Sequence, residues 1–316
     1  MAQGVDSMKK AVVIGSLNYD TSLTLERMPQ PGETIPATGI TLNPGGKGAN
    51  QAAALAKLGC SVWMAGAVGR DAPGDALLES LERAGVDCSH VARREEPTGQ
   101  AFITVDRAGE NSIVILAGAN GKVTPAQVES HRELLAQVDC LVMQLEIPLD
   151  AVLAGAKLAA ALGKLVVLDP APAPGPLPRE LLSLCGLIKP NETELHLLTG
   201  LPTATPQECQ AAACRLLDQG VKAVLVSLGS RGAMAVTEEG FRLAPAYPVK
   251  AVDSTSAGDC FTAAFLARWQ GGYSLPELED ALRYANAAAA LTVGRRGAQS
   301  SIPTRDEVER LFSGTT

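Results

Sequence analysis

Aromatic and charged residues are both scarce in this 316-residue chain, at 3% and 19% of positions. So few rings argue against the aromatic platforms on which single-stranded nucleic acids stack. The 27 Lys and Arg residues against 34 Asp and Glu residues give a formal charge of −7, which disfavours binding to a phosphate backbone or an anionic membrane. We therefore expect small-molecule substrates, with no nucleic acid and no membrane as partner.

The seven cysteines are scattered, odd in number and without a Cys-x-x-Cys pair. This distribution disfavours both a disulfide framework and a zinc knuckle, and indicates reduced thiols. Residues 1–10 lack the apolar run of a signal peptide, and no later stretch has the roughly 18 charge-free apolar residues of a membrane helix. The sequence thus predicts a cytoplasmic protein.

Several familiar kinds of catalytic and nucleotide site are also missing. The three histidines, His90, His131 and His196, show no metal-ligand spacing, and no Ser/His/Asp or Cys/His set can be built. The first apolar run, VVIGSLNYD, lacks the Gly-x-Gly-x-x-Gly fingerprint, and the stretch PGGKGAN has Gly48 where a Walker A loop needs Ser or Thr. Ordinary dinucleotide and P-loop sites are therefore disfavoured.

What the chain has is an alternation of short Val/Ile/Leu runs with longer Ala/Leu-rich stretches. The strand-like runs lie at 11–15, 141–145, 165–168 and 224–228. Helical periodicity is clearest at 48–58, 74–84, 125–136, 149–162, 206–219, 258–269 and 276–293. This alternation predicts an α/β fold, in which a mostly parallel sheet is flanked by helices on both faces of a single domain spanning 1–316.

Two segments, 22–41 and 100–116, break the alternation. The first alternates small and apolar residues around Pro29 and Pro31, and the second has two alternating runs on either side of a turn at 107–110. Such patterns are typical of antiparallel strands. We expect insertions at about 19–42 and 98–117 to form a small antiparallel β lid.

The alternating pattern also gives the predicted lid one apolar face. A small-molecule substrate is too small to cover such a face, and a monomer would leave it in water. We therefore expect a homodimer in which two lids pack face to face, with Phe102 or Ile115 in the contact.

A turn of small residues, DSTSAGD at 253–259, runs into an apolar helix. The backbone amides of Ala257, Gly258 and Asp259 would lie at the positive end of the helix dipole and form an anion hole for a phosphoryl group. The Asp259 carboxylate could accept the proton of an attacking hydroxyl. On this segment alone, a plain helix cap at Asp259 is an equally good interpretation.

A second motif, NPGGKGANQA at 43–52, places three glycines among four residues where a helix starts. The glycines allow the backbone to approach a ligand closely, and Asn50 offers a donor and an acceptor, which suits a polyol. The alternative is a tight turn with a capped helix. Asn18, Asp20 and Glu146 follow or end strands, where open α/β sheets bind ligands.

Together these motifs resemble the ribokinase branch of the carbohydrate kinase family, which also holds adenosine kinase. The resemblance covers nearly the whole chain and keeps the family's motif order. Its motifs are GSLNYD (15–20), PGGKGANQAA (44–53), MQLEIP (143–148), DPAPA (169–173), NETE (191–194), LGSRG (228–232), VDSTSAGDCF (252–261) and GAQSSIP (297–303). It implies a ribokinase-like fold and phosphorylation of D-ribose at its 5-hydroxyl, with ATP, Mg²⁺ and K⁺.

The resemblance also implies roles for individual residues. Those matching the sugar site are Asn18, Asp20, Gly46, Lys47, Gly48, Ala49, Asn50 and Glu146, with Asp259 as the base and Ala257 and Gly258 in the anion hole. Those matching the ATP site are Asn191, Ser227, Leu228, Gly229, Ser230, Arg231, Gly232, Gly258 and Asn286. Those matching a K⁺ site are Asp253, Thr255, Thr292, Arg295, Gly297 and Ser301, while Glu194 matches a residue that acts on Mg²⁺ through water. The alternative for Glu194 is a helix-capping box with Asn191.

The chain departs from the family at three positions. Ribokinases usually carry Asn where this chain has Asp169, Thr where it has Cys260, and commonly His near Asn286. We expect these changes to bear on the adenine contact and to leave the sugar-contacting residues unaffected.

Two other functions remain open at this point. One is a related kinase acting on deoxyribose, another sugar or a nucleoside, although the polar Asn18, Asp20 and Glu146 favour a polyhydroxylated substrate. The other is a catalytically silent regulator that binds sugar or nucleotide. The presence of Gly258 and Asp259 disfavours the regulator.

Overall fold

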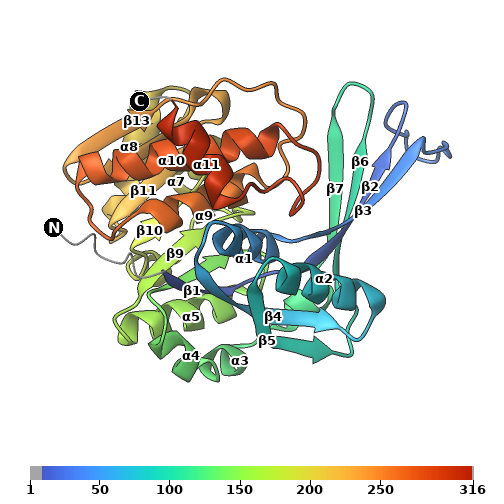
Figure 1. Ribbon diagram of the computed structural model, residues 1–316, viewed down its shortest axis with the longest axis horizontal. Helices are drawn as coiled ribbons and strands as arrows, with labels where there is room; N and C mark the ends of the chain where they lie inside the picture. The colour runs from blue at the N-terminus through green and yellow to red at the C-terminus, as the bar shows by residue number, and fades with distance from the viewer. Residues whose placement is uncertain (1–8, 315–316) are drawn as a thin grey trace.

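A nine-stranded sheet forms the centre of the computed structural model, which describes residues 9–314 (Figure 1). Its strands are β1 (Lys10–Ile14), β4 (Ser61–Gly69), β5 (Val86–Arg94), β8 (Cys140–Gln144), β9 (Leu165–Asp169), β10 (Leu187–Ile188), β11 (Ala223–Ser227), β12 (Ala233–Thr237) and β13 (Gly240–Ala244). Their order is β13-β12-β11-β10-β9-β8-β1-β4-β5. Neighbours from β11 to β5 pair in parallel, while β12 and β13 are antiparallel. The predicted mostly parallel sheet is confirmed.

Helices cover both faces of this sheet, because alternate residues of each buried strand point to opposite sides. Ala11 and Val13 of β1 pack in one hydrophobic cluster, and Val12 and Ile14 pack in the other. The first cluster holds α1 (Lys47–Lys57), α2 (Ala72–Arg83), α9 (Ala257–Arg268), α10 (Leu275–Val293) and α11 (Arg305–Ser313). The second holds α3 (Pro125–Glu129), α4 (Arg132–Ala136), α5 (Leu149–Ala161), α6 (Arg179–Leu182), α7 (Glu192–Thr199) and α8 (Pro206–Leu217). Within residues 9–314, no helix combines the length and the apolar character needed to cross a membrane.

The predicted helix at 125–136 is wrong as a single element, because α3 and α4 are separate. The Ser130 hydroxyl donates to the Gln127 carbonyl at 2.6 Å, and the His131 ring packs edge-on against His90 with 5.2 Å between ring centroids. A hydroxyl bound to its own backbone competes with helix continuation. The other six predicted helices are present, with ends that differ by up to two residues.

A second, four-stranded sheet stands off the side of the larger one (Figure 1). Its order is β3-β2-β6-β7, and its strands are β2 (Asn18–Thr24), β3 (Gly39–Gly45), β6 (Gly99–Val105) and β7 (Asn111–Leu116). Each hairpin is antiparallel, as predicted, and the two hairpins join through a parallel pairing of β2 with β6. The first hairpin is shifted outward from 22–41, because residues 25–38 form its loop.

The register of this lid assigns its two faces. Phe102 lies beside Thr21 on one side and Val114 on the other, and Thr21 lies beside Leu42. The next row, which includes Asp20, Ala101 and Ile115, points to the opposite face. Phe102 and Ile115, the two candidates for the predicted contact, therefore lie on different faces.

Candidate active site

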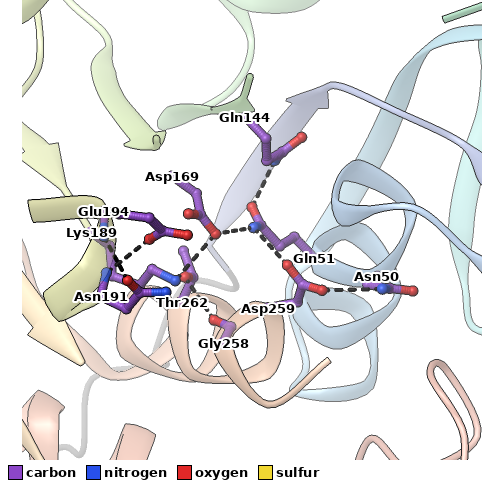
Figure 2. A network of polar contacts seen from close by, with 10 residues as sticks. All are labelled: Asn50, Gln51, Gln144, Asp169, Lys189, Asn191, Glu194, Gly258, Asp259 and Thr262. Atoms are coloured by element: carbon purple, nitrogen blue, oxygen red, sulfur yellow. Dashed lines mark hydrogen bonds and ion pairs between the residues drawn. The ribbon is translucent and has the colours of Figure 1, made fainter. Parts of the chain in front are cut away.

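Asp259 lies in the first turn of α9, with only 7% of its surface exposed. Two amides of α1 hold its carboxylate. Asn50 Nδ2 donates to Oδ2 at 3.1 Å, and Gln51 Nε2 donates to Oδ1 at 3.0 Å (Figure 2). Burial raises the pKa of Asp259, while the positive charge of Lys47 opposes that rise. The result is an oriented carboxylate with increased proton affinity, as a general base requires.

The glycine motif brings α1 to this position. Gly46 adopts a φ of 89°, which side chains other than glycine rarely tolerate. A Cβ on Gly48 would lie 2.6 Å from the backbone nitrogen of Ser16, so the helix start rests directly on the chain after β1. The buried Ala49 donates its amide to the Ser16 carbonyl at 2.9 Å and fixes this approach.

Glu146 follows β8, and its carboxylate accepts three hydrogen bonds. Its Oε2 accepts from Ser16 Oγ at 2.5 Å, from the Lys47 amide at 3.2 Å and from Asn18 Nδ2 at 3.4 Å. Burial raises the pKa of Glu146, and the charge of Lys47 and the hydrogen bonds from Ser16 and the Lys47 amide oppose the rise. The structure thus brings Asn18, Lys47 and Glu146 together, as the sequence predicts.

Asp20 reaches the same place from the lid. A Cβ on Gly45 would lie 2.1 Å from Asp20 Oδ2, so only glycine leaves room for this carboxyl group. Burial, followed by the charges of Glu146 and Asp259, raises the pKa of Asp20 to about 7. Three carboxyl groups therefore share one electrostatic environment that joins lid and body.

The positive charge of Lys47 acts to lower the pKa of each of these three carboxyl groups. Burial alone would lower the pKa of Lys47 itself, but surrounding carboxylates raise it above the ordinary value: Asp259, Asp169, Glu146 and Glu194. The site also keeps an unused acceptor, since the Oδ1 of Asn50 is buried without a hydrogen-bond partner among the described residues. Mixed carboxylate, amide and ammonium groups of this kind suit a ligand rich in hydroxyls.

At the start of α9 the chain prepares an anion site. Ser256 adopts a left-handed φ of 62°, and the first helical bond runs from the Cys260 amide to the Ser256 carbonyl at 2.8 Å. The amide of Ala257 donates to the Ser254 carbonyl at 3.2 Å. In this conformation, the anion hole predicted for three amides is therefore reduced to those of Gly258 and Asp259.

The residues that match an ATP site converge from two directions. Asn191 and Ser227 form a parallel bridge, and Asn191 caps α7 through the reciprocal bonds of a capping box with Glu194. The capping interpretation of Glu194 is thus correct as far as its Oε2 is concerned. Burial and the charge of Asp169 raise the pKa of Glu194.

The other ATP-matching residues surround β13 and the loop after it. Leu228 donates its amide to the Gly232 carbonyl at 2.8 Å, which closes the turn η2 (Gly229–Arg231). A Cβ on Gly232 would lie 2.1 Å from the Ala244 carbonyl, and Asn286 Nδ2 donates to that same carbonyl at 2.9 Å. The exposed Ser230 lies in the turn, whereas the Arg231 guanidinium pairs with Glu192.

The residues that match a K⁺ site lie in two neighbouring loops. Asp253 Oδ1 accepts from the Thr255 amide at 2.9 Å and hydroxyl at 2.6 Å, and Oδ2 accepts from the Gly297 amide at 3.0 Å. The Arg295 side chain turns to Glu307 at 2.6 Å, so the backbone of Arg295 alone is left for an ion. The hydroxyls of Thr292 and Ser301 donate to the carbonyls of Ala288 and Ala298.

Behind the base lies a chain of polar side chains that the sequence motifs do not predict. Gln51 Nε2 donates both to Asp259 and to Asp169 Oδ2, the latter at 2.8 Å, and Gln144 Nε2 donates to Gln51 Oε1 at 2.7 Å (Figure 2). Lys189 Nζ lies 3.2 Å from the same oxygen of Asp169. Asp169 therefore shares Gln51 with the base, and its expected bearing on the adenine contact stays a prediction.

Some sequence signals for these residues existed. Gln51 directly follows the predicted Asn50, and Lys189 stands two residues before Asn191. Asn120 carried no such signal, yet its side chain donates to Asn18 Oδ1 at 2.7 Å and accepts from the Leu17 amide at 2.9 Å. It holds Asn18 in place from a part of the chain about a hundred residues away.

Within the described range, no group of three or more His, Cys, Asp and Glu side chains is placed to hold a metal ion. A divalent ion here would therefore need ligands from a substrate in addition to protein oxygens. Mg²⁺ is commonly bound in that way, through one or two carboxylates and substrate phosphates.

Comparison with known proteins is consistent along the whole chain. A ribokinase of Staphylococcus aureus (strain COL) is 41% identical over 304 residues, covering 96% of this chain and 99% of the relative. A deoxyribokinase of Salmonella typhi is 36% identical over 303 residues, covering 95% and 98%. The solved structure of an Arabidopsis thaliana ribokinase complexed with ribose and ATP has a TM-score of 0.89 at 38% identity, covering 96% of this chain and 99% of that one.

A family model described as the pfkB family of carbohydrate kinases matches residues 8–305. That span contains the glycine motif of α1, the lid, the carboxylate cluster and the start of α9. The chain therefore belongs to the pfkB family of carbohydrate kinases.

Proposed function

We propose that this protein is an ATP-dependent ribokinase that phosphorylates the 5-hydroxyl of D-ribose. The observation that carries the proposal is Asp259, a buried carboxylate in the first turn of α9 that two amides of α1 orient. A base beside a helix N-terminus suits in-line phosphoryl transfer, in which a hydroxyl loses its proton as negative charge builds on the transferred group.

Ribose binds on the other side of Asp259 from the anion hole. Asn18, Asp20 and Glu146 accept and donate hydrogen bonds to its hydroxyls, and the unused Oδ1 of Asn50 accepts another. Because Asp20 belongs to lid strand β2 and Glu146 to the body, bound sugar links the two. Closure of the lid then excludes water that would otherwise take the phosphoryl group.

Chemistry at the reacting atoms follows from the same geometry. Asp259 removes the proton of the sugar hydroxyl, and the amides of Gly258 and Asp259 stabilise the transferred phosphoryl group. The lysine ammonium of Lys47 offsets the negative charge of the surrounding carboxylates. ATP lies against the surface formed by Asn191, the 227–232 turn and Asn286.

Oxygen ligands for both cations are present. Glu194, whose pKa is raised by burial and then by the charge of Asp169, would hold Mg²⁺ through water, and Mg²⁺ would supply charge neutralisation on the ATP phosphates. The Asp253–Gly297 contact joins the two loops whose carbonyl oxygens match a K⁺ site. A K⁺ ion bound there would order the loop that leads into the anion hole.

A homodimer through the lid is part of the proposal. The face that carries Phe102 also carries Ile40, Leu42 and Val114. Phe102 is 44% exposed, Ile40 65%, Leu42 53% and Val114 65%. Leu42, Phe102 and Val114 lie in one row across the sheet that is interrupted by Thr21, and Ile40 lies in the adjoining row of the same face. Exposed apolar side chains gathered in this way are of the kind that marks interaction surfaces. The opposite face, with Asp20, is left free to cover the sugar.

The cysteines support a cytoplasmic location. All seven lie within the described residues and are free, and six of them are buried. Unpaired thiols persist in reducing compartments.

Deoxyribose is the second candidate substrate, because a deoxyribokinase is among the relatives. An ATP-consumption assay across D-ribose, 2-deoxyribose, fructose and adenosine distinguishes them. We expect the highest kcat/KM with D-ribose. A higher value with any other acceptor would contradict the assignment, and no turnover with any of them would favour a silent binding protein.

A further inference from the structure

Lys189 and Asp169 form a buried ion pair beside the general base. Their side chains are 6% and 2% exposed, and Lys189 Nζ lies 3.2 Å from Asp169 Oδ2. That oxygen also accepts from Gln51, whose same nitrogen holds Asp259 (Figure 2). The pair is therefore connected to the catalytic carboxylate through a single side chain.

The ammonium of Lys189 lies against the start of α9. A Cβ built on Gly258 would be 3.3 Å from Lys189 Nζ, so the ammonium lies against the side of Gly258 where a larger residue would carry its side chain. Gly258 contributes one of the amides of the anion hole. The Lys189 ammonium is thus a third donor, and a charged one, next to the two backbone amides that face the phosphoryl position.

The balance of charges around the site shows why the position of Lys189 matters. Two lysines, Lys47 and Lys189, are the cations whose charges act on the carboxyl groups around the site. Those carboxyl groups are Asp20, Glu146, Asp169, Glu194 and Asp259. A phosphoryl group entering such a field is repelled unless a cation meets it. A buried ion pair also adds little stability compared with apolar packing, because both ions lose their hydration. Its position at the anion hole therefore calls for a role other than stability.

We propose that Lys189 binds the transferring phosphoryl group as a catalytic residue and that Asp169 is its positioning residue. This inference rests on the proposed phosphoryl transfer. Asp169 Oδ2 anchors the ammonium, while its other oxygen, Oδ1, is buried with no hydrogen-bond partner in the described chain. An anchor through one oxygen leaves two of the three ammonium protons of Lys189 free to reach phosphoryl oxygens.

The test measures binding of a mimic of the transferring phosphoryl group. Calorimetric titrations with Mg²⁺ and D-ribose compare ADP alone with ADP plus aluminium fluoride. In Lys189→Met, we expect affinity for ADP alone to stay within about threefold of wild type and affinity for the aluminium fluoride complex to fall by at least about tenfold. Lys189→Arg should recover part of that loss. Lys157→Met, at a lysine that pairs with Glu180 on the surface, is the matched control and should change neither affinity.

A second variant separates binding from folding. Lys189→Met leaves the Asp169 charge buried and unpaired, which can destabilise the fold, whereas Asp169→Asn with Lys189→Met removes both charges. We expect the double variant to fold and still to bind the aluminium fluoride complex weakly. Wild-type affinity in the double variant would overturn the inference, because Lys189 would then merely neutralise Asp169.

Equal weakening of ADP alone and of the aluminium fluoride complex would also overturn it, since Lys189 would then bind nucleotide uniformly. Failure of the proposed function gives a different result. In that case the wild-type protein would itself bind the complex no better in the presence of D-ribose than in its absence.

Discussion

Asp20, Glu146 and Asp259 each have a raised pKa, chiefly because burial disfavours their charged forms. The folded protein without ligand therefore holds protons that the unfolded chain would release. The pKa of Asp20 rises from the ordinary value of 3.8 to about 7 in the folded protein. Stability from this group is present at low pH and is lost as the pH rises through about 7.

This sign leads to a prediction for Asp20→Asn. The amide removes a carboxylate that the fold must bury in charged form above pH 7, so the ligand-free variant should melt at a higher temperature than wild type. The gain should be larger at pH 8 than at pH 5, and stabilisation by added D-ribose should be lost. Thermal unfolding followed by circular dichroism at both pH values measures this.

The control is Glu239→Gln, at an exposed position between β12 and β13 that should show no pH-dependent gain. An Asp20→Asn gain that is equal at both pH values, or greater at pH 5, would show that the carboxyl group is not buried as a charge.

At this scale, the sequence identified groups that act through local motifs and missed those that act through space. Asp259 and Asn50 belong to recognisable sequence motifs, and in the structure Asn50 Nδ2 donates to Asp259 Oδ2 at 3.1 Å. Asn120 acts on a partner brought close by the folded chain, and no spacing in the sequence indicates it, while the position of Lys189 two residues before Asn191 gives no hint of its contact with Asp169. The departure at Asp169 is visible in the sequence, but the contact of Asp169 with Gln51 depends on how β9 and α1 meet.

At the scale of elements, the long amphipathic helices and the buried strands were predictable because each carries its own periodicity. The two-residue β10 and the short α6 offer too few residues for a period to be read. The break between α3 and α4 depends on Ser130 and on the packing of His131 against His90, a tertiary contact. The parallel pairing of β2 with β6 likewise joins segments that are far apart in sequence.

The loop before α9 carries a prediction about monovalent cations. The Gly297 amide donates to Asp253 Oδ2 at 3.0 Å and so joins two loops. An ion held by nearby carbonyls would restrain the loop on which the anion hole depends. Replacing K⁺ by Na⁺ or Li⁺ at constant ionic strength should lower kcat, because a smaller ion fits the same oxygens poorly. Initial rates in the three chlorides measure this. Equal rates would mean that the loop is ordered without an ion.

For the whole molecule, the lid register places Phe102 and Ile115 on opposite faces of the lid. Phe102 lies on the face that also carries Leu42 and Val114, so Phe102→Glu should weaken the proposed dimer and raise the KM for ribose more than the KM for ATP. The reason is that a lid released from its partner closes less well over the sugar. Sedimentation velocity and steady-state kinetics on the same samples provide the measurement.

Leu243→Glu is the control, since Leu243 is 40% exposed on β13, at the opposite edge of the large sheet from the lid side. It should leave both association and KM unchanged. A wild-type protein that sediments as a fully active monomer at assay concentration would rule out the lid dimer.

The most direct test of the whole account is Asp259→Asn. The amide keeps the shape and the contact with Gln51 but cannot accept a proton, so kcat for D-ribose should fall by at least about a hundredfold. Calorimetry should show ribose and ATP still binding to the variant. If the variant kept more than about a tenth of wild-type kcat, the assignment of Asp259 as the base would be contradicted.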